Sequence, residues 1–232
     1  MSMRSSLASI LFIGLPLGLA AQAAGPDDAA TLAGQVAGDT YVSATGLFRI
    51  TVPVQPELGG NITDTPNVVT FADSFTTHIT IAVFPLDATQ RWELSTGTKK
   101  DYLVKFFSGF LLADFREKFP GASVESATFL PTVQDGALLV YALLPGGSMF
   151  NQRIVLFGAS DNLPIAKRGN LLFVKGDNIF ILSSEIAERA TERSLYTKTT
   201  AQEDEILKDR LLGVLGQMRF TSAAVAAPSA GQ

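Results

Sequence analysis

The chain of 232 residues contains no cysteine and a single histidine, His78. Without cysteine there are no disulfides, no thiolate nucleophile and no thiolate metal ligand. Structural zinc sites recruit four nitrogen or sulfur ligands, so one histidine does not supply such a site. Folding must therefore rest on a hydrophobic core, for which 47% of the residues are apolar.

Charge is also scarce, and basic charge is not in excess. Charged residues make up 17% of the chain, with 18 Lys and Arg against 22 Asp and Glu, for a net charge of -4. Proteins that bind nucleic acid or anionic membrane surfaces by electrostatics carry a basic excess. We therefore expect no nucleic-acid partner.

Signatures of catalysis and of nucleotide binding are missing as well. The sequence has no Gly-x-Gly-x-x-Gly or Gly-x-x-x-x-Gly-Lys-Ser/Thr motif, and Gly147-Ser148-Met149 lacks the second glycine of a nucleophile elbow. A hydrolase would have to use His78 as its base. The alternative is a structural histidine on the polar face of a strand or at a sheet edge. We expect no catalytic residue, no cofactor and no metal.

The first 23 residues have the features of a secretory signal peptide. One cation, Arg4, precedes an apolar run over residues 7–20, and Ala21-Gln22-Ala23 forms a small-x-small cleavage pattern. The run is too short for a bilayer span, which needs roughly 20 residues. We therefore expect a periplasmic or secreted protein with no integral membrane segment after cleavage.

Composition also suggests the domain boundaries. Residues 24–39 and 221–232 are small and polar, so we expect a flexible N-terminal segment and a disordered tail. Residues 40–220 then form one α+β domain, without internal repeats or a linker.

Strand patterns come first in this domain. In GLFRITVPV, the side chains of Phe48, Ile50 and Val52 alternate with Arg49 and Thr51, which is typical of a half-buried strand. Further strands are predicted in NVVTFADSF, THITIAVFPL, ASVESATFLPTV, GALLVYALL, SMFNQRIVLFG and LLFVKGDNIFILSSE. Between the two apolar runs of the last, Lys175-Gly176-Asp177-Asn178 predicts a hairpin turn rather than a cation site.

Two amphipathic helices are predicted. The first begins at a capping box, Thr98 to Asp101, and ends at Pro120-Gly121. The second begins at a similar box, Thr200 to Glu203. The apolar stripes of the two helices are Leu103, Phe106, Phe107, Phe110, Leu111 and Phe115, and Ile206, Leu207, Leu211, Val214, Leu215 and Met218.

This order of elements predicts an α+β sandwich. Consecutive strands lie too close in sequence for helical crossovers, so the sheet should be mainly antiparallel, with about six to eight strands. Each of the two long helices must bury an apolar stripe, and the faces of the sheet are the available surface.

The pattern resembles the PsbP-like family of α/β/α sandwiches. The resemblance rests on YVSATGLFRITVPV, ITIAVFPL, DYLVKFFSGFLLADF and EILKDRLLGVLGQMRF, and covers about residues 40–220. The family includes an extrinsic photosystem protein, a nuclear-import factor that binds Ran, and bacterial envelope proteins such as DcrB. Many members have a tryptophan soon after the opening proline, where this chain has Val54-Gln55-Pro56-Glu57. The resemblance implies a mostly non-enzymatic protein.

Phenylalanine is abundant, and five of the 16 lie between Phe106 and Phe119. A stripe this broad either fills the core or leaves rings for a ligand or a partner. Candidate surface residues are Phe106, Phe107, Phe110 and the single tryptophan, Trp92, expected in a loop before the helix. Three functions stay open: a protein-binding module of the envelope, a carrier of an apolar small molecule or lipid beneath the Phe-rich helix, and a hydrolase using His78.

Overall fold

In the computed structural model we describe residues 32–74, 77–148, 165–186 and 196–221, which belong to one compact unit, Leu32–Gln232. The strands of this mixed α+β fold are β1 (Gln35–Ala37), β2 (Thr40–Val42), β3 (Phe48–Thr51), β4 (Asn61–Asp64), β5 (Val68–Ala72), β6 (His78–Pro85), β7 (Ser123–Leu130), β8 (Ala137–Pro145), β9 (Ile165–Lys175), β10 (Asn178–Ile186) and β11 (Arg219–Phe220). The helices are η1 (Pro56–Leu58), α1 (Ala88–Thr96), α2 (Lys99–Phe106), η2 (Phe107–Leu111), α3 (Leu112–Lys118) and α5 (Thr200–Gln217).

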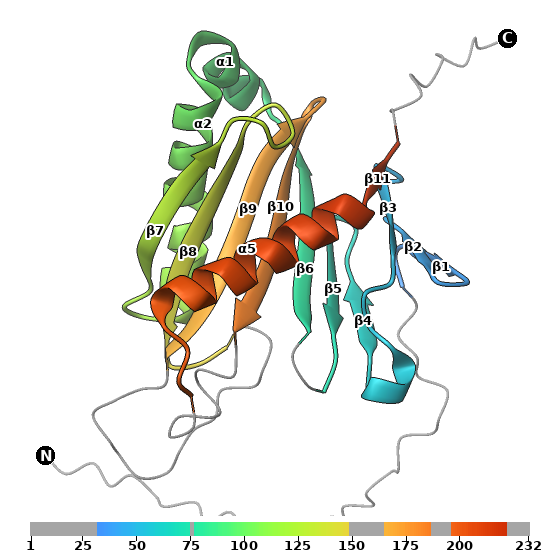
Figure 1. The fold of residues 1–232 in the computed structure, drawn as a ribbon. Helices are drawn as coiled ribbons and strands as arrows, with labels where there is room; N and C mark the ends of the chain where they lie inside the picture. Colours follow the sequence, from blue (N-terminus) through green and yellow to red (C-terminus); the bar gives the residue numbers. More distant parts are fainter. Residues whose placement is uncertain (1–31, 75–76, 149–164, 187–195, 222–232) are drawn as a thin grey trace, which may run out of the picture. The chain divides into compact units, whose positions relative to one another are not determined.

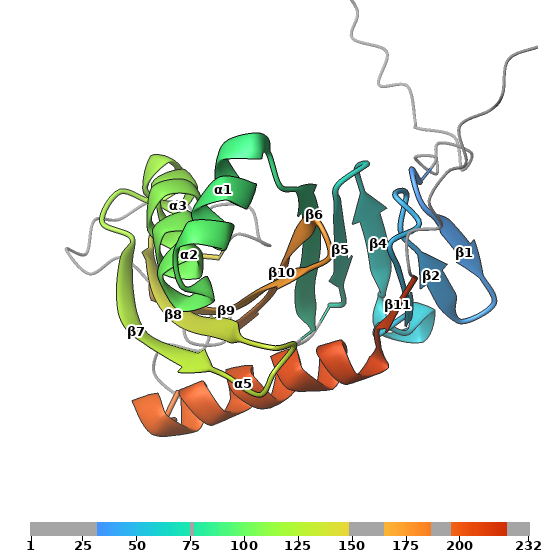
Figure 2. The ribbon, with the colours of Figure 1, turned by 90° about the horizontal axis from the view of Figure 1, so that it is seen from above.

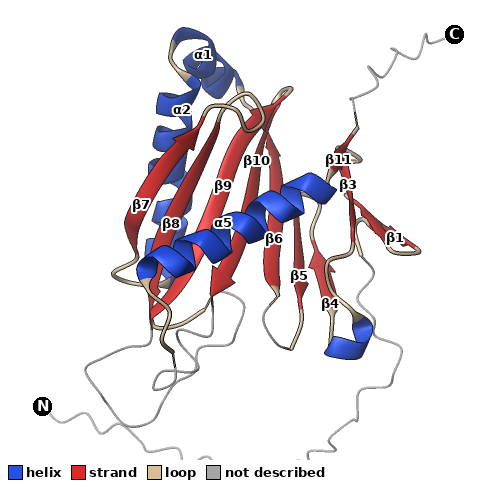
Figure 3. Ribbon diagram, in the orientation of Figure 1, coloured by secondary structure: helices blue, strands red, loops and turns tan. Residues whose placement is uncertain are grey.

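The main sheet has seven strands in the order β4-β5-β6-β10-β9-β8-β7, and every pair of neighbours is antiparallel. Helices cover both of its faces (Figures 1 and 2). On one face α1, α2, η2 and α3 follow one another, and on the other face α5 runs diagonally across the strands (Figure 3). The predicted α+β sandwich with an antiparallel sheet is confirmed.

A second sheet, β1-β2-β3-β11, was not expected. The alternation predicted for GLFRITVPV is confirmed, since Phe48 and Ile50 are buried while Arg49 and Thr51 are exposed. This strand pairs with β2 and with the C-terminal β11, and not with the main sheet.

The N-terminal segment 24–39 was expected to be flexible, but its last residues include β1. The cause lies in β4, where the Asp64 carboxylate accepts the backbone N–H groups of Ala33 and Gly34 at 2.8 and 2.7 Å. The same carboxylate accepts the Tyr41 hydroxyl at 2.7 Å. Asp64 thus binds two segments to the edge of the main sheet: the residues just before β1, and strand β2.

The Phe-rich helix comprises α2, η2 and α3. It begins where predicted, because the Thr98 hydroxyl accepts the backbone N–H of Asp101. It is interrupted by the π-helical turn η2. Helix α1 was missed because none of its residues is buried, so it carries no apolar stripe.

The cap of the last helix lies one residue earlier than predicted. Thr199, and not Thr200, is the N-cap: its hydroxyl accepts the backbone N–H of Gln202, and the side-chain Oε1 of Gln202 accepts the backbone N–H of Thr199. Glu203, which was predicted to close the capping box, does not take part in it. Its side chain is buried against the sheet.

The hairpin prediction at Lys175–Asn178 is confirmed. Strand β9 ends at Lys175, β10 begins at Asn178, and these two residues are paired across the turn. Gly176 has a φ of +58°, a value that glycine adopts without strain at the first central position of a two-residue hairpin. Of the strand predicted in SMFNQRIVLFG, all but Ser148 lies outside the described residues.

Two apolar clusters fill the sandwich. The cluster under α5 is formed by side chains including Tyr41, Phe48, Phe71, Ile81, Phe173, Phe180, Leu207 and Leu211. The cluster under α2, η2 and α3 includes Leu103, Phe107, Leu111, Leu112, Phe115, Leu138, Leu172 and Ile181. Among the described helices none combines the length and apolar character needed to cross a bilayer.

Candidate functional site

Three phenylalanines form a cluster that is open to solvent beside the Phe-rich helix. The ring of Phe110 lies 5.3 Å from that of Phe106 and 6.1 Å from that of Phe84 in β6, measured between centroids. Phe84 and Phe106 are half-buried, whereas Phe110 is 56% exposed. We call Phe84, Phe106 and Phe110 the aromatic surface.

The π turn explains how one phenylalanine is exposed while its neighbour is buried. Phe107 and Leu111 are buried at the two ends of η2, and Phe110 lies between them. A π turn takes more residues per turn than an α-helix, so side chains three residues apart diverge more. Phe110 therefore leaves the buried stripe that it shares with Phe107 in the sequence pattern. Such turns occur frequently at functional sites.

The four candidate surface residues do not form one surface. Phe107 is 2% exposed and packs edge-to-face on Phe115 at 6.3 Å, so it belongs to the core. Trp92 lies in helix α1, and not in a loop, and is 65% exposed. Phe106 and Phe110 remain as neighbours on the helix.

Apolar side chains occupy the space beneath the Phe-rich helix. Leu103, Phe107 and Leu111 are buried in one cluster with Leu138 and Leu172 of the sheet. These contacts are the packing expected of a core. The site predicted by the carrier hypothesis is thus filled by the protein's own side chains at these positions.

His78 lies at the start of β6, between β5 and β10, and is buried. Of the two structural alternatives, the sheet edge is therefore wrong, and His78 lies instead on a partly polar face of the strand. On the same face of the sheet, four polar side chains are aligned by the strand register: Thr70, Thr80, Ser183 and Asn170. Ser183 donates its hydroxyl hydrogen to Asn170 at 2.9 Å. A nucleophilic serine would instead donate to the histidine base.

Lys167 of β9 is fully buried and binds three carboxylates. Its ammonium lies 2.5 Å from Asp204 and 3.3 Å from Glu203 of α5, and it also contacts Glu125 of β7. Burial alone would lower the pKa of Lys167, but the hydrogen bonds and charges of Asp204 and Glu125 raise it above its ordinary value. Tyr196 donates its hydroxyl to Glu203 at 2.8 Å. This ion cluster attaches the first turn of α5 to the sheet.

Arg168, the next residue of β9, makes a second buried ion pair, with Glu185 of β10 at 3.4 Å. Its guanidinium lies 5.6 Å from the ring centroid of Phe115 in α3. Burial lowers the pKa of Arg168, against the opposing charge of Glu185. Among the described residues, no group of acids and histidine is arranged to hold a metal ion.

Both ion pairs were missed in the sequence. The available signal was the pair Lys167-Arg168 within the otherwise apolar strand IAKRGNLLFVK, because adjacent charges in a buried strand must both find partners. The carboxylates come from elements as far as 42 positions away, so the sequence offered no means of naming them.

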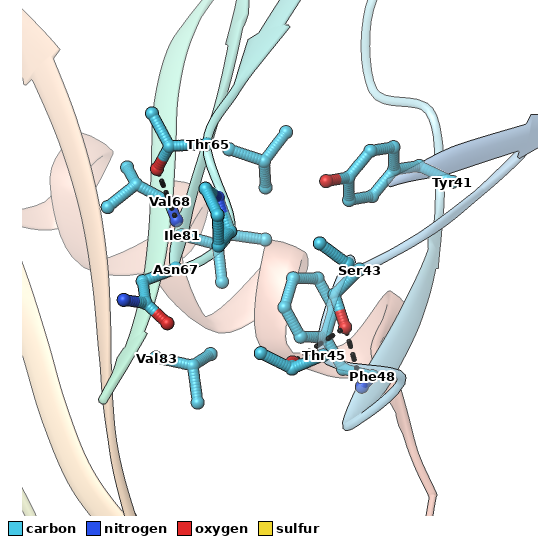
Figure 4. A pocket seen from close by; sticks show the side chains of 12 residues that line it. Tyr41, Ser43, Thr45, Phe48, Thr65, Asn67, Val68, Ile81 and Val83 are labelled. Carbon is cyan, nitrogen blue, oxygen red and sulfur yellow. Dashed lines mark hydrogen bonds between the residues drawn. The ribbon is translucent and has the colours of Figure 1, made fainter. Parts of the chain in front are cut away.

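A small cavity separates the turn between β2 and β3 from strands β5 and β6 (Figure 4). Tyr41, Ser43 and Thr65 contribute polar groups, and Ile81 and Val83 contribute apolar ones. Its volume of about 10 Å³ is that of one water molecule and excludes an organic ligand.

Comparison with known proteins finds no family model and no curated protein that matches the chain. Solved structures do show similarity. Cyanobacterial PsbP (CyanoP) from Synechocystis sp. PCC 6803 has 13% identity and a TM-score of 0.48, over 85% of this chain and 98% of that one. The Ran-binding protein Mog1p of Saccharomyces cerevisiae has 10% identity and a TM-score of 0.41, over 82% and 96%. Both TM-scores are below 0.5, and neither identity exceeds 13%.

Proposed function

We propose that this protein is a non-enzymatic module that binds another protein in the periplasm of a Gram-negative cell, and that the aromatic surface is its contact. The periplasmic location rests on the leader over residues 1–23. Kinship with envelope proteins such as DcrB belongs to the same proposal and rests on the order of elements.

The exposure of Phe110 carries the proposal. A phenylalanine that is 56% exposed, beside two half-buried rings, is costly to leave in water. Clustered aromatic side chains provide much of the binding energy at protein interfaces. The backbone that carries Phe110 is also anchored, because the flanking Phe107 and Leu111 are buried in the core. Rigid anchors lose little conformational entropy on binding.

The alternatives have less support. A hydrolase would need the Ser183 hydroxyl aimed at His78, and that hydroxyl is donated to Asn170. A carrier would need room beneath the Phe-rich helix, where Leu103, Phe107 and Leu111 are packed against the sheet.

The proposal is tested by affinity capture from the envelope fraction of the native host, followed by Kd measurement with the purified partner. Phe110→Ala should weaken binding by about 30-fold, the loss of a typical hot-spot residue. Val124→Ala is the matched control, since Val124 is 40% exposed but lies in β7. Equal affinity of the wild type and the Phe110→Ala variant would show that the aromatic surface is not part of the interface.

A further inference from the structure

The main sheet ends on one side in strand β7, which pairs only with β8 among the described residues. After a bulge at Glu125, the strand keeps a regular register from Ser126 to Leu130. This run, SATFL, has no charged residue and no proline, which are common means of preventing a sheet edge from pairing. The opposite edge strand, β4, is only four residues long and includes the charged Asp64. The run from Ser126 to Leu130, which we call the open edge, is therefore better suited to accept another strand.

Side chains of the open edge are accessible on both faces of the sheet. Ser126 and Thr128 lie on the face under α5, because the residues of β8 paired with them belong to the cluster under α5. Ala127 lies on the opposite face, and all three residues are exposed. Phe129 shares the face of Ala127 and is half-buried against the cluster under the Phe-rich helix. An added strand would therefore place alternate side chains beside hydroxyl groups and beside apolar groups.

An open groove of about 370 Å³ adjoins the hydroxyl side of the open edge. The first turns of α5 lie beside β7 and β8 in both views (Figures 1 and 2). Ser126 and Thr128 line the groove from the strand, and Asp204, Glu205 and Asp209 line it from the helix. A side chain of an added strand on this face would therefore enter a groove with an acidic wall.

The charges of the helix wall indicate what kind of side chain suits the groove. Lys208 also belongs to this wall, and Asp204 is already paired with Lys167. Glu205 and Asp209 are exposed and lie one helical turn apart, a spacing at which like charges repel each other. Neither has a salt-bridge partner among the described residues. A cationic side chain in the groove would be attracted by both carboxylates and would relieve their repulsion.

We propose that the open edge binds an extended segment of a second partner protein, in which basic and apolar residues alternate. The backbone of the segment would pair with β7 as an added strand. Its basic side chains would lie near Glu205 and Asp209, and its apolar side chains beside Ala127 and Phe129. A second copy of this chain suits the edge less, because it would bring the same acids and a net charge of -4. The open edge shares no residue with the aromatic surface, so either proposal can fail without the other.

The test titrates the full-length protein with the peptide acetyl-Lys-Val-Lys-Val-Lys-amide, observed by ¹⁵N NMR. Saturable shifts should be centred on Ala127, Thr128 and Phe129. The control acetyl-Glu-Val-Glu-Val-Glu-amide has the same length and the opposite charge, and should bind at least roughly tenfold more weakly. A lysine peptide that is N-methylated at each internal residue keeps its charge but loses the backbone donors. It should cause no saturable shifts, because it does not form the ladder of a strand.

Substitutions in the protein test the acidic wall. Glu205→Gln and Asp209→Asn should each weaken binding of the lysine peptide by about threefold, the effect of losing one exposed ion pair. Glu57→Gln, at an exposed acid of η1 that does not line the groove, removes the same charge and should leave binding unchanged. All three acids are exposed, so the variants should fold as the wild type does.

Equal binding of the lysine and glutamate peptides would overturn the proposal, as would undiminished binding of the N-methylated peptide. Shifts that lie away from β7, or equal effects of Glu57→Gln and Asp209→Asn, would show that the peptide responds to net charge and not to the open edge. Sedimentation velocity tests the remaining occupant. A dimer of the free protein in which the β7 amides are protected from exchange would show that a second copy covers the edge, and would also overturn the proposal.

Discussion

Lys167 and Arg168 are adjacent in β9, so their side chains lie on opposite faces of the sheet. Each side chain contacts a different buried carboxylate. Lys167 reaches Glu203 on the α5 face, and Arg168 reaches Glu185 on the face of α3. Lys167 thus attaches α5 to the sheet, while Arg168 joins β9 to β10 and lies over the Phe115 ring of α3. Because removal of one partner leaves a buried charge uncompensated, both contacts should matter for stability.

Lys167→Met should destabilise the fold by about 3 kcal/mol, because three carboxylates then converge without a cation. Urea unfolding monitored by circular dichroism measures this free energy. Lys208→Met, at an exposed lysine of α5, is the control and should change stability by less than about 0.5 kcal/mol. A similar loss of stability in both variants would show that the loss does not come from breaking the buried ion cluster of Lys167.

Stability should also fall steeply at alkaline pH. Burial, with the nearby carboxylates of Asp204 and Asp209, raises the pKa of Tyr141 from 10.0 to about 12. Burial raises the pKa of Tyr102 to about 12 as well, and the pKa of Lys167 is also raised. For each group the folded state favours the protonated form, so its stabilising effect is complete below the unfolded pKa and is lost as pH rises through the folded value.

The measurement is the free energy of unfolding between roughly pH 9 and pH 12. Tyr141→Phe removes one of these titrating groups and should flatten the pH dependence, although it also loses the hydrogen bond to the Asp204 carbonyl at 2.8 Å. A wild-type stability that stays level across this range would contradict the assignment.

Asp64→Asn should release the N-terminal strand. Burial alone would raise the pKa of Asp64, but hydrogen bonds from Gly34, Tyr41 and Ala33 lower it below its ordinary value of 3.8. The carboxylate therefore stabilises this contact above that pH, and its effect is lost as the pH falls through the lowered value.

Hydrogen exchange of the Ala33 and Gly34 amides provides the measurement. The protection factors of both amides should fall in Asp64→Asn and in the wild type at acidic pH, and the loss of stability should be about 1–2 kcal/mol because the Tyr41 hydroxyl loses a charged acceptor. Thr63→Ala, one residue away on the exposed side of β4, is the control and should leave both amides protected. Unchanged protection in Asp64→Asn would mean that β1 is held by other contacts.

Two phenylalanines separated by three positions should behave differently. Phe107→Ala should cost about 3–5 kcal/mol because it opens a cavity in the core, while Phe110→Ala should change stability by less than about 1 kcal/mol since its ring is largely in water. Thermal unfolding of the two variants compares them directly. Equal losses would show that Phe110 is part of the core.

The sequence was sufficient wherever the signal was local. The alternation around Phe48 and Ile50 predicted a half-buried strand, and the turn residues at Gly176 predicted the hairpin. The amphipathic stripes predicted both long helices and so the sandwich. These features depend on residues a few positions apart, which is the range over which backbone periodicity acts.

Contacts between residues far apart in the sequence determine the features that the sequence patterns did not predict. The small sheet depends on the pairing of β3 with β11, and β1 depends on Asp64 some 30 residues away. A helical pattern places Phe107 and Phe110 on the same apolar stripe. The π turn buries Phe107 and leaves Phe110 exposed. Sequence periodicity assumes an unbroken α-helix, so it did not make this distinction.

The most direct test of the aromatic surface is photo-crosslinking in the living native host. A benzophenone amino acid placed at position 110 should give one discrete protein adduct, and that adduct should weaken when Phe106 is replaced by alanine. The same probe at Val124, an exposed apolar position in β7, should not give it. An identical adduct from both positions, or no adduct from position 110, would contradict a protein-binding role for this surface.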